Sequence, residues 1–364
     1  MFHPEIYLTV WQLLSQLPYP GFPRLRMRKT HILCIVILGS FLTIAALHLQ
    51  LTRMARQWVP SPCACCATFQ PPLLANGTTL SDGTYTYRLD PGIYNDLFPH
   101  LQQYRCRELT CEQSWCPEAS AAPLLLLAIK SHPGSSARRA ALRRTWARAR
   151  EMGGFRIRHV FLMAVSPNQK QMNLATEENE EFGDILLWDF MESHHNLSLK
   201  ERCFLQWVHS RCPGVAYIFK GDDDLFVNLP ALTEYLAQTP NASRFIHGNI
   251  QRHSAVMRTG KYAVSTALYS QRYYPNFASG GGFIVPGPLI PALHQASLEL
   301  PVFPLDDVYM AFLTLAAGLP HRHDKRFKVW GIPKDDIALY RDSLTVHGSS
   351  MERMEEVWQE LWVS

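Results

Sequence analysis

The sequence predicts an α/β fold with a mainly parallel central sheet. Beyond residue 123, short and wholly apolar runs alternate with segments of helical character. Strands that are buried on both faces have such runs, and their alternation with helices is typical of a sheet covered by helices. The expected strands are Leu124–Ile129, His159–Val165, Asp184–Asp189 and Val215–Lys220, and the expected helices between them are Ser136–Arg150 and Asn196–Arg211.

One segment predicts a membrane anchor. Residues 31–51 read HILCIVILGSFLTIAALHLQL and contain no Asp, Glu, Lys or Arg. As a helix rising ~1.5 Å per residue, this run is long enough to cross the hydrocarbon core of about 30 Å, and it is too long and too far from the N-terminus for a cleaved signal peptide. Four basic residues between positions 24 and 29 precede it, against Arg53 and Arg56 after it. The positive-inside rule therefore places residues 1–30 in the cytosol, as in a single-pass type II signal-anchor.

The remaining chain has features of a secretory lumen. Asn76, Asn196 and Asn241 each begin an acceptor sequon for N-glycosylation. Disulfide bonds are expected in an oxidising lumen, and eight cysteines follow the anchor: Cys63, Cys65, Cys66, Cys106, Cys111, Cys116, Cys203 and Cys212. No matching His/Cys pair follows the first three at zinc-site spacing, which disfavours a metal site there.

The composition predicts how the chain divides into regions, and its charge disfavours a nucleic-acid partner. Residues 52–120 are rich in Pro, Gly and Asn and predict a stem with a cysteine-containing subdomain, and residues 121–364 predict the lumenal domain. The formal net charge is only +4 over 364 residues. Because no long basic face with interleaved aromatic residues is present, we expect no nucleic-acid partner.

Three consecutive carboxylates, Asp222, Asp223 and Asp224, follow the fourth predicted strand directly. Clustered carboxylates repel one another, and Mg²⁺ or Mn²⁺ relieves the repulsion through oxygen ligands. Asp222 and Asp224 point to the same side of an extended chain. Ligands of open α/β sheets bind beyond the carboxyl ends of the strands, so this position favours a metal site over a solvated acidic turn.

Three other segments carry candidate residues with two interpretations each. Asp306 and Asp307 precede an apolar helical stretch, where they either cap the helix or act as a general base. Gly280, Gly281 and Gly282 form either a tight turn or a close approach to a ligand. The basic helix at Arg138–Arg144 is either a solvated face or a diphosphate contact.

Several of these segments together resemble the β1,3-glycosyltransferase family of β1,3-galactosyl- and β1,3-N-acetylglucosaminyltransferases. The resemblance covers about residues 100–360. Its segments occur in the expected order: LLLLAIKS, RRAALRRTW, FGDILLWDF, NLSLK, KGDDDLFV, ASGGGF, FPLDDVYM and LTVHG. It implies a GT-A-like nucleotide-sugar-binding fold and an inverting transfer reaction. It also implies a Golgi membrane enzyme, and it allows a homo- or hetero-oligomer with other glycosyltransferases.

The resemblance assigns roles to matching positions. Asp222, Asp224 and His347 would hold Mn²⁺ or Mg²⁺ against the donor diphosphate, although His347 by itself would be taken for an ordinary core or surface histidine. Asp307 would be the catalytic base, with Asp306 second. The remaining roles are donor binding, implied for Lys130, Arg139, Arg143, Trp146, Asp222 and Asp223, and sugar-pocket contacts, implied for Trp188, Asp189, Gly280, Gly281 and Gly282.

Phe303-Pro-Leu-Asp-Asp-Val resembles the N-acetylglucosaminyl branch, so the expected donor is UDP-GlcNAc and the expected acceptor a galactose-ended glycan. The alternatives are a β1,3-galactosyltransferase that uses UDP-Gal, or a non-catalytic chaperone or lectin-like relative. A membrane receptor would explain the anchor and the sequons but not the acidic clusters. Cys203 stands where relatives usually have an aliphatic residue, so no disulfide pairing follows from the resemblance.

Overall fold

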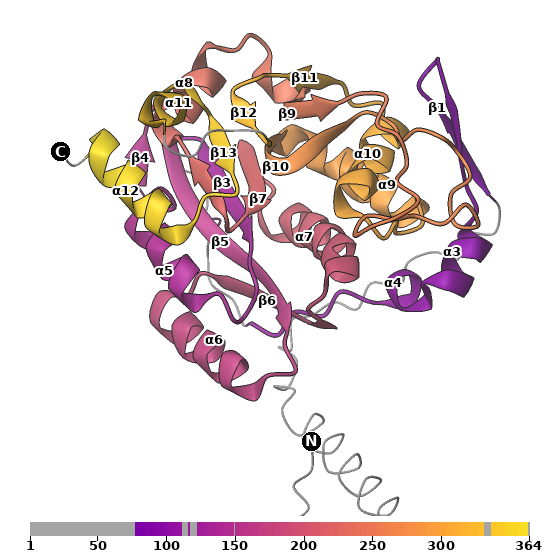
Figure 1. The fold of residues 1–364 in the computed structure, drawn as a ribbon, viewed down its shortest axis with the longest axis horizontal. Helices are drawn as coiled ribbons and strands as arrows, with labels where there is room; N and C mark the ends of the chain where they lie inside the picture. The colour runs from indigo at the N-terminus through magenta and orange to yellow at the C-terminus, as the bar shows by residue number, and fades with distance from the viewer. Residues whose placement is uncertain (1–76, 111–115, 117–121, 149, 331–335, 363–364) are drawn as a thin grey trace, which may run out of the picture. The chain divides into compact units, whose positions relative to one another are not determined.

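The computed structural model describes residues 77–364 except 111–115, 117–121, 149, 331–335 and 363–364 (Figure 1). The chain divides into two units, residues 1–59 and residues 60–364, and every described residue belongs to the second. The predicted anchor at 31–51, the sequon at Asn76 and four of the eight cysteines that follow the anchor lie outside the described residues. In the part that is described, no helix combines the length and apolarity that crossing a membrane requires.

A mixed eight-stranded sheet forms the centre of the domain. Its strands are β3 (Leu124–Lys130), β4 (Arg150–Met152), β5 (Phe155–Val165), β6 (Ile185–Met191), β7 (Tyr217–Asp222), β9 (Ile246–Gln251), β10 (Phe277–Pro286) and β11 (His321–His323). The order is β11-β9-β10-β7-β3-β5-β4, with β6 also paired to β5. Strands β6, β5, β3 and β7 are parallel, as the sequence predicts, whereas β10 runs antiparallel to both β7 and β9. The α/β prediction is therefore confirmed, and the sheet is mainly parallel, with β10 and β4 as its antiparallel strands.

The helices cover both faces of the sheet (Figure 1). One face carries α5 (Ser136–Arg144), α6 (Gln169–Phe182), α8 (Leu229–Gln238), α11 (Ile337–Asp342) and α12 (Met351–Trp362); the other carries α7 (Leu197–Arg211), α9 (Ile290–Glu299) and α10 (Asp306–Ala316). Strand β3 explains why: Leu124, Leu126 and Ala128 lie in one core cluster, and Leu125, Leu127 and Ile129 lie in the other. Successive side chains of a strand point to opposite faces, so only a strand covered on both sides is apolar throughout.

The N-terminal part of the described chain packs into the same core. It forms a hairpin of β1 (Thr78–Ser81) and β2 (Thr86–Leu89), followed by the short helices α3 (Pro91–Leu97) and α4 (Pro99–Gln103). Tyr87, Leu89, Tyr94 and Leu101 are buried in the core cluster that also contains α7, α9 and α10. Residues 77–110, part of the segment in which the sequence predicts a stem and a cysteine-containing subdomain, therefore share a core with α7, α9 and α10.

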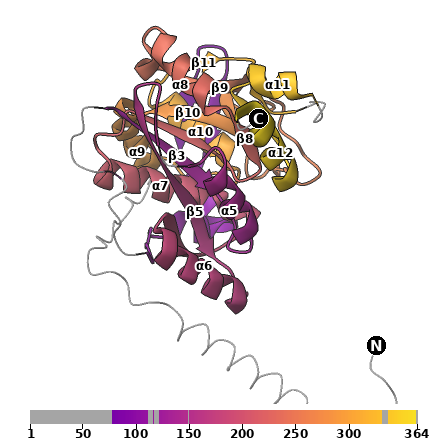
Figure 2. The same cartoon turned by 90° about the vertical axis from the view of Figure 1, so that its left-hand side faces the viewer.

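Two disulfide bonds fasten the next segment to helix α7. Cys106 pairs with Cys203, and Cys116 pairs with Cys212. Between them, Leu109 N–H donates to Leu187 O at 2.8 Å, and Glu108 pairs with Trp188 in an antiparallel bridge. The cysteine at position 203, unusual by resemblance, thus has its partner in this chain, and residues 104–110 lie beside β6. Figure 2 shows α7 and α5 on opposite sides of β3 and β5.

A third, small sheet decides the position of one predicted ligand. Strand β13 (Thr345–His347) lies between β12 (Phe327–Lys328) and β8 (Leu225–Val227). Its pairing with β8 is antiparallel and places His347 opposite Leu225. Since β8 directly follows the acidic triplet, this register brings a residue from the end of the chain to the end of β7.

The two disulfide bonds close overlapping loops, which predicts non-additive stability. When Cys203→Ser opens the bond to Cys106, the Cys116–Cys212 bond leaves a loop of only about 20 residues, so we expect a loss of about 3 kcal/mol. Opening the second bond as well releases a loop of almost 100 residues and costs about 5 kcal/mol more. Guanidinium unfolding of Cys203→Ser, Cys212→Ser and the double variant measures this; strictly additive losses would contradict it.

Candidate active site

The carboxyl ends of β3 and β7 place a buried lysine between two acidic segments. Lys130 is the last residue of β3, and its side chain is 5% exposed. Its Nζ lies 3.1 Å from Asp222 Oδ1 and 2.6 Å from Asp306 Oδ2. Burial lowers the pKa of Lys130, but the charges of Asp222 and Asp306 outweigh it and hold the pKa well above its usual value. A buried ammonium of this kind requires paired anions, so Lys130 joins the end of β7 to the start of α10.

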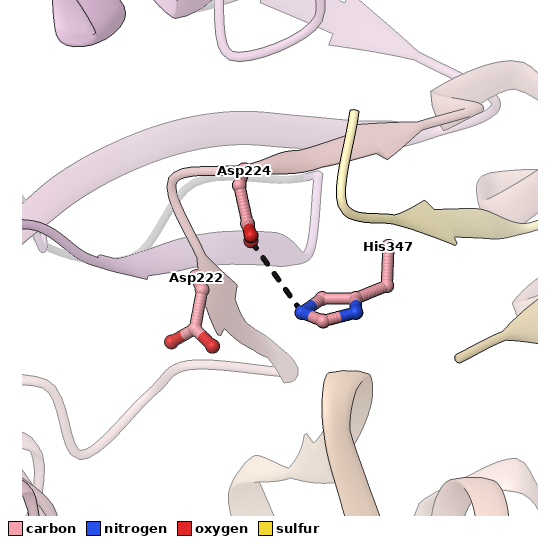
Figure 3. Close-up of side chains that lie close together, drawn as sticks. All are labelled: Asp222, Asp224 and His347. Atoms are coloured by element: carbon pink, nitrogen blue, oxygen red, sulfur yellow. Dashed lines mark ion pairs between the residues drawn. The ribbon is translucent and has the colours of Figure 1, made fainter. Parts of the chain in front are cut away.

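Asp222, Asp224 and His347 lie together at this edge of the sheet (Figure 3). One potential ligand atom from each lies within 4.8 Å of the others. His347 Nε2 faces Asp224 Oδ1 at 3.7 Å, and this buried carboxylate oxygen has no hydrogen-bond partner. The structure therefore brings the three predicted metal ligands together, and their carboxylate oxygens suit Mn²⁺ or Mg²⁺.

Asp223, the middle carboxylate, points away from this cluster. It accepts a hydrogen bond from Ser131 Oγ at 2.7 Å and lies 3.8 Å from the guanidinium of Arg138. Burial raises the pKa of Asp223, against the lowering by the Ser131 hydrogen bond. Ser131 was not predicted as a site residue, because neither its type nor its spacing marks it in the sequence, and Arg138 was predicted only as part of the basic helix Arg138–Arg144.

The Asp306–Asp307 pair begins helix α10 in its first turn, and neither carboxylate caps the helix. The N-cap is Leu305, and no side chain caps the helix there. Asp307 instead accepts a hydrogen bond from Gly280 N–H at 2.8 Å. The capping interpretation is thus wrong for the N-cap itself, although first-turn carboxylates still interact favourably with the helix dipole.

The two neighbouring carboxylates differ in protonation. Burial raises the pKa of Asp306, but the ammonium of Lys130 more than offsets this, so the pKa lies below its usual value. Burial and the adjacent Asp306 charge raise the pKa of Asp307 to about 8, and Lys130 only partly counteracts them. The pair therefore provides one firmly ionised carboxylate and one strong carboxylate base, as coupled acids at catalytic sites do.

The glycine segment lies in an irregular part of β10. The pairing of β10 with β9 shifts register between Ala278 and Phe283. A Cβ on Gly280 would lie 2.9 Å from Asp307 Oδ1, and one on Gly281 would lie 2.5 Å from a methyl group of Val329. Gly282 has a φ of +104°, which side chains rarely allow. The bulge thus permits the backbone to approach Asp307 closely.

The structure places the predicted arginines in the scaffold. Arg139 is fully buried and donates to both carboxylate oxygens of Glu178, at 2.8 and 2.7 Å. It also donates to Ser131 Oγ and His132 O. Arg143 donates to Asp184 at 2.7 and 2.6 Å and lies 2.7 Å from Glu178. Both guanidinium groups are occupied by internal acceptors, so the predicted contact with the donor is wrong and their role is to fasten α5 to α6.

Both predicted tryptophans are core residues. Trp146 is fully buried, donates its Nε1–H to Leu225 O at 2.9 Å and packs edge-on against Phe219. Trp188 is 2% exposed and stacks on Phe190. Neither ring can contact a nucleotide or a sugar. Trp146 still acts on the site indirectly, because it supports the backbone just after Asp224.

Asp189 and the sequon residues have different surroundings. Asp189 accepts a hydrogen bond from Tyr104 and lies 3.3 Å from Arg107 Nε, so it anchors the disulfide-linked segment.

Asn196 is 9% exposed and donates its amide to Met191 O at 2.8 Å. Asn241 is exposed with a φ of 54°. Of the two predicted glycosylation positions that the structure describes, Asn241 alone offers an accessible amide.

The raised pKa of Asp307 predicts that the carboxylate destabilises the metal-free protein as it ionises. A folded-state pKa of about 8 against an ordinary 3.8 means that the unfolded state releases this proton first, so stability is lost as pH rises between about 4 and 8. Asp307→Asn should therefore raise the free energy of unfolding at pH 8.5 and do so much less at pH 5. Urea unfolding at both values tests this, with the exposed Asp96→Asn as control; equal effects of Asp307→Asn at the two values would contradict it.

Comparison with known proteins identifies the family. Residues 137–325 match the family model described as Galactosyltransferase. The human N-acetyllactosaminide beta-1,3-N-acetylglucosaminyltransferase 4 is 36% identical over 72% of this chain and 70% of its own length. The rat UDP-GlcNAc:betaGal beta-1,3-N-acetylglucosaminyltransferase 7 is 32% identical over 73% of this chain and 72% of its own length.

Likeness to solved structures is lower. The galactosyltransferase LgtC in complex with donor and acceptor sugar analogues is 14% identical, with a TM-score of 0.34 over 66% of this chain and 96% of that one. This likeness is too low to support a shared fold. The family model covers more than half of the chain and contains the acidic triplet, the glycine segment and the Asp306–Asp307 pair. The chain therefore belongs to the Galactosyltransferase family.

Proposed function

We propose that this protein is an inverting β1,3-N-acetylglucosaminyltransferase that transfers GlcNAc from UDP-GlcNAc to the 3-hydroxyl of a terminal galactose. One observation carries the proposal: Lys130 holds the ligand cluster at Asp222 and the basic carboxylate pair at Asp306 on the same edge of the sheet. A sugar transfer needs both functions within the length of one sugar ring. The names of the relatives support the donor and acceptor, and the parallel strands β6-β5-β3-β7 are compatible with a GT-A-like fold.

Asp222, Asp224 and His347 would hold the divalent cation, Mn²⁺ or Mg²⁺. Asp224 Oδ1 supports this, because a buried carboxylate oxygen without a hydrogen-bond partner is costly. A bound cation supplies charge neutralisation for the diphosphate of the leaving UDP. Asp223 does not belong to this set; with Ser131 and Arg138 it lies on the side where the nucleotide would bind.

Asp307 would take the proton of the acceptor's 3-hydroxyl as that oxygen attacks the anomeric carbon of the donor. The attack occurs opposite the departing UDP, so the configuration inverts. The Gly280 N–H holds one carboxylate oxygen of Asp307, which leaves the other for the hydroxyl. The raised pKa of Asp307 makes it a better base than an ordinary carboxylate, and the paired Asp306 remains ionised beside it.

We propose a Golgi membrane location with a type II anchor at residues 31–51 and a lumenal catalytic domain. The Cys106–Cys203 and Cys116–Cys212 bonds support an oxidising compartment. The accessible amide of Asn241 is compatible with glycosylation there. Assembly with other glycosyltransferases is part of the same proposal and has no further support from the described residues.

The decisive assay offers UDP-GlcNAc and UDP-Gal separately to the full-length protein in detergent, with Mn²⁺ and a lactosamine acceptor. We expect GlcNAc transfer that EDTA abolishes. Asp307→Asn should lower kcat by a factor of about 10² to 10⁴, because it removes the base without changing shape, and Asp224→Asn should raise the Mn²⁺ concentration needed for half-maximal rate. Asp96→Asn is the matched control. Preferred transfer of galactose would reassign the donor, and no transfer by folded protein would favour a non-catalytic relative.

Gly280→Ala provides an independent test of the base. The added Cβ would displace the Asp307 carboxylate, which it would otherwise approach to 2.9 Å. Moving the carboxylate oxygen that takes the proton should lower kcat by a factor of about 10². The melting temperature should change little. Gly214→Ala, whose Cβ would meet nothing within 4 Å, is the control. Wild-type activity of Gly280→Ala would argue against Asp307 as the base.

A further inference from the structure

A long connection between β9 and β10 forms an ordered lobe, residues 252–276. Arg258 holds it together by donating to Val264 O, Tyr269 O and Gln271 O at 2.8 to 2.9 Å. Within the lobe, Ala255 forms an antiparallel bridge with Tyr273, and the buried Val264, Leu268 and Tyr269 side chains belong to the core. Its exposed side chains are therefore presented from a fixed backbone.

The lobe is basic and aromatic. It contains four basic side chains, and the sequence has no Asp or Glu from residue 251 to residue 298. Arg258 is occupied by the carbonyl groups of the lobe, while Arg252, Lys261 and Arg272 are exposed. Lys261 Nζ lies 5.1 Å from the centre of the Tyr262 ring, which is 46% exposed. Exposed aromatic rings beside cations attract ligands that combine an apolar face with negative charge.

One histidine connects the lobe with the catalytic carboxylates. The His194 ring lies 5.4 Å from the Tyr262 ring. Burial lowers the pKa of His194, the Lys261 charge lowers it further, and the Asp306 charge acts in the opposite direction. His194 follows β6, whose end lies at the same edge of the sheet as the ends of β3 and β7 because these strands are parallel. Its Nε2 is buried and has no hydrogen-bond partner, so the polar edge of this ring lacks a ligand.

We propose that the β9–β10 lobe binds the acceptor glycan beyond its terminal galactose, and that Lys261 and Tyr262 select acceptors with an anionic group on the adjoining sugar. The anionic group is a sulfate ester or a carboxylate. The Tyr262 ring packs against the C–H face of that sugar, and the Lys261 ammonium pairs with its charge. This inference rests on the proposed function, because it assumes that the galactose hydroxyl reaches Asp307.

The donor diphosphate is the competing ligand for Lys261. Its expected place is beside Asp222, Asp224 and His347, which lie at the ends of β7 and β13. Lys261 instead adjoins Tyr262, whose ring lies 5.4 Å from that of His194. His194 follows β6, which lies on the other side of β3 from β7. Lys261 therefore fits a contact with the acceptor better than a contact with the donor. Loss of an acceptor contact would raise KM for the acceptor, whereas loss of a donor contact would raise KM for the UDP-sugar.

The test compares three acceptors with the full-length enzyme and whichever UDP-sugar the wild type uses: galactosyl-GlcNAc, its 6-sulfate on GlcNAc, and galactosyl-glucuronate. We expect kcat/KM to be about threefold higher for an anionic acceptor, the size of a typical exposed charge pair. A gain with only one anionic acceptor identifies sulfate or carboxylate as the source. Lys261→Ala should abolish the gain and leave the neutral acceptor within about twofold, and Lys170→Ala on the distant helix α6 is the charge-matched control.

Tyr262→Ala should raise KM for all three acceptors about tenfold with little change in kcat, and Tyr262→Phe should restore it because the ring is retained. Equal kcat/KM for neutral and anionic acceptors in the wild type would overturn the proposal. An increase in KM for the UDP-sugar alone in Lys261→Ala would also overturn it.

Failure of the proposed function is distinguishable from failure of this inference. If the wild type turns over no acceptor, the transferase assignment fails. Saturation-transfer NMR of the sulfated and neutral acceptors with the wild type and Lys261→Ala then still decides the inference. Tighter binding of the sulfated acceptor that Lys261→Ala abolishes supports the lobe as a glycan-binding surface, and equal binding rejects it.

Discussion

The buried ammonium of Lys130 is the interaction on which the candidate site depends. It lies at the end of the central strand β3, and its two anionic partners come from β7 and from the first turn of α10. A charge buried to this degree is stable only with paired anions, so the sheet and the helix cannot separate without exposing or neutralising it. The same contact keeps Asp306 ionised, and the Asp306 charge raises the pKa of Asp307. One lysine thereby fixes the position of Asp222 and, through Asp306, influences the pKa of Asp307.

Two departures from regular sheet geometry complete the site. The bulge in β10 brings the Gly280 N–H to Asp307, and the small sheet of β12, β13 and β8 brings His347 to Asp224. Both depend on backbone placement more than on side-chain type. This explains why glycine is required at one point, where a Cβ would collide with Asp307, and why a histidine 123 residues beyond Asp224 becomes its neighbour.

The basic residues of α5 show how similar charges acquire different roles. The guanidinium groups of Arg139 and Arg143 pair with the carboxylates of Glu178 and Asp184. These internal acceptors occupy the donors that a diphosphate would need. Arg138, one position earlier, remains partly exposed and reaches toward Asp223. The helix therefore turns its inner arginines to the scaffold and its outer one to the site. The β9–β10 lobe repeats this division, since Arg258 is structural while Lys261 is exposed.

The sequence by itself determined the strands β3, β5, β6 and β7, the helices α5 and α7, and the carboxylates that converge at the strand ends. It could do so because strands buried on both faces are uniformly apolar and because parallel strands end at a common edge. It predicted neither α6 nor the end of α5 at Arg144, six residues before the expected Arg150. The resemblance to the β1,3-glycosyltransferase family added His347 as a predicted metal ligand. It also ranked Asp307 before Asp306 as the predicted catalytic base. Only the tertiary structure decided that β10 is antiparallel, that Cys106 pairs with Cys203, and that Trp146, Trp188, Arg139 and Arg143 are buried. Residue type shows that a side chain is able to bind a ligand, but its exposure and its partners depend on contacts between residues far apart in the chain, which local pattern does not contain.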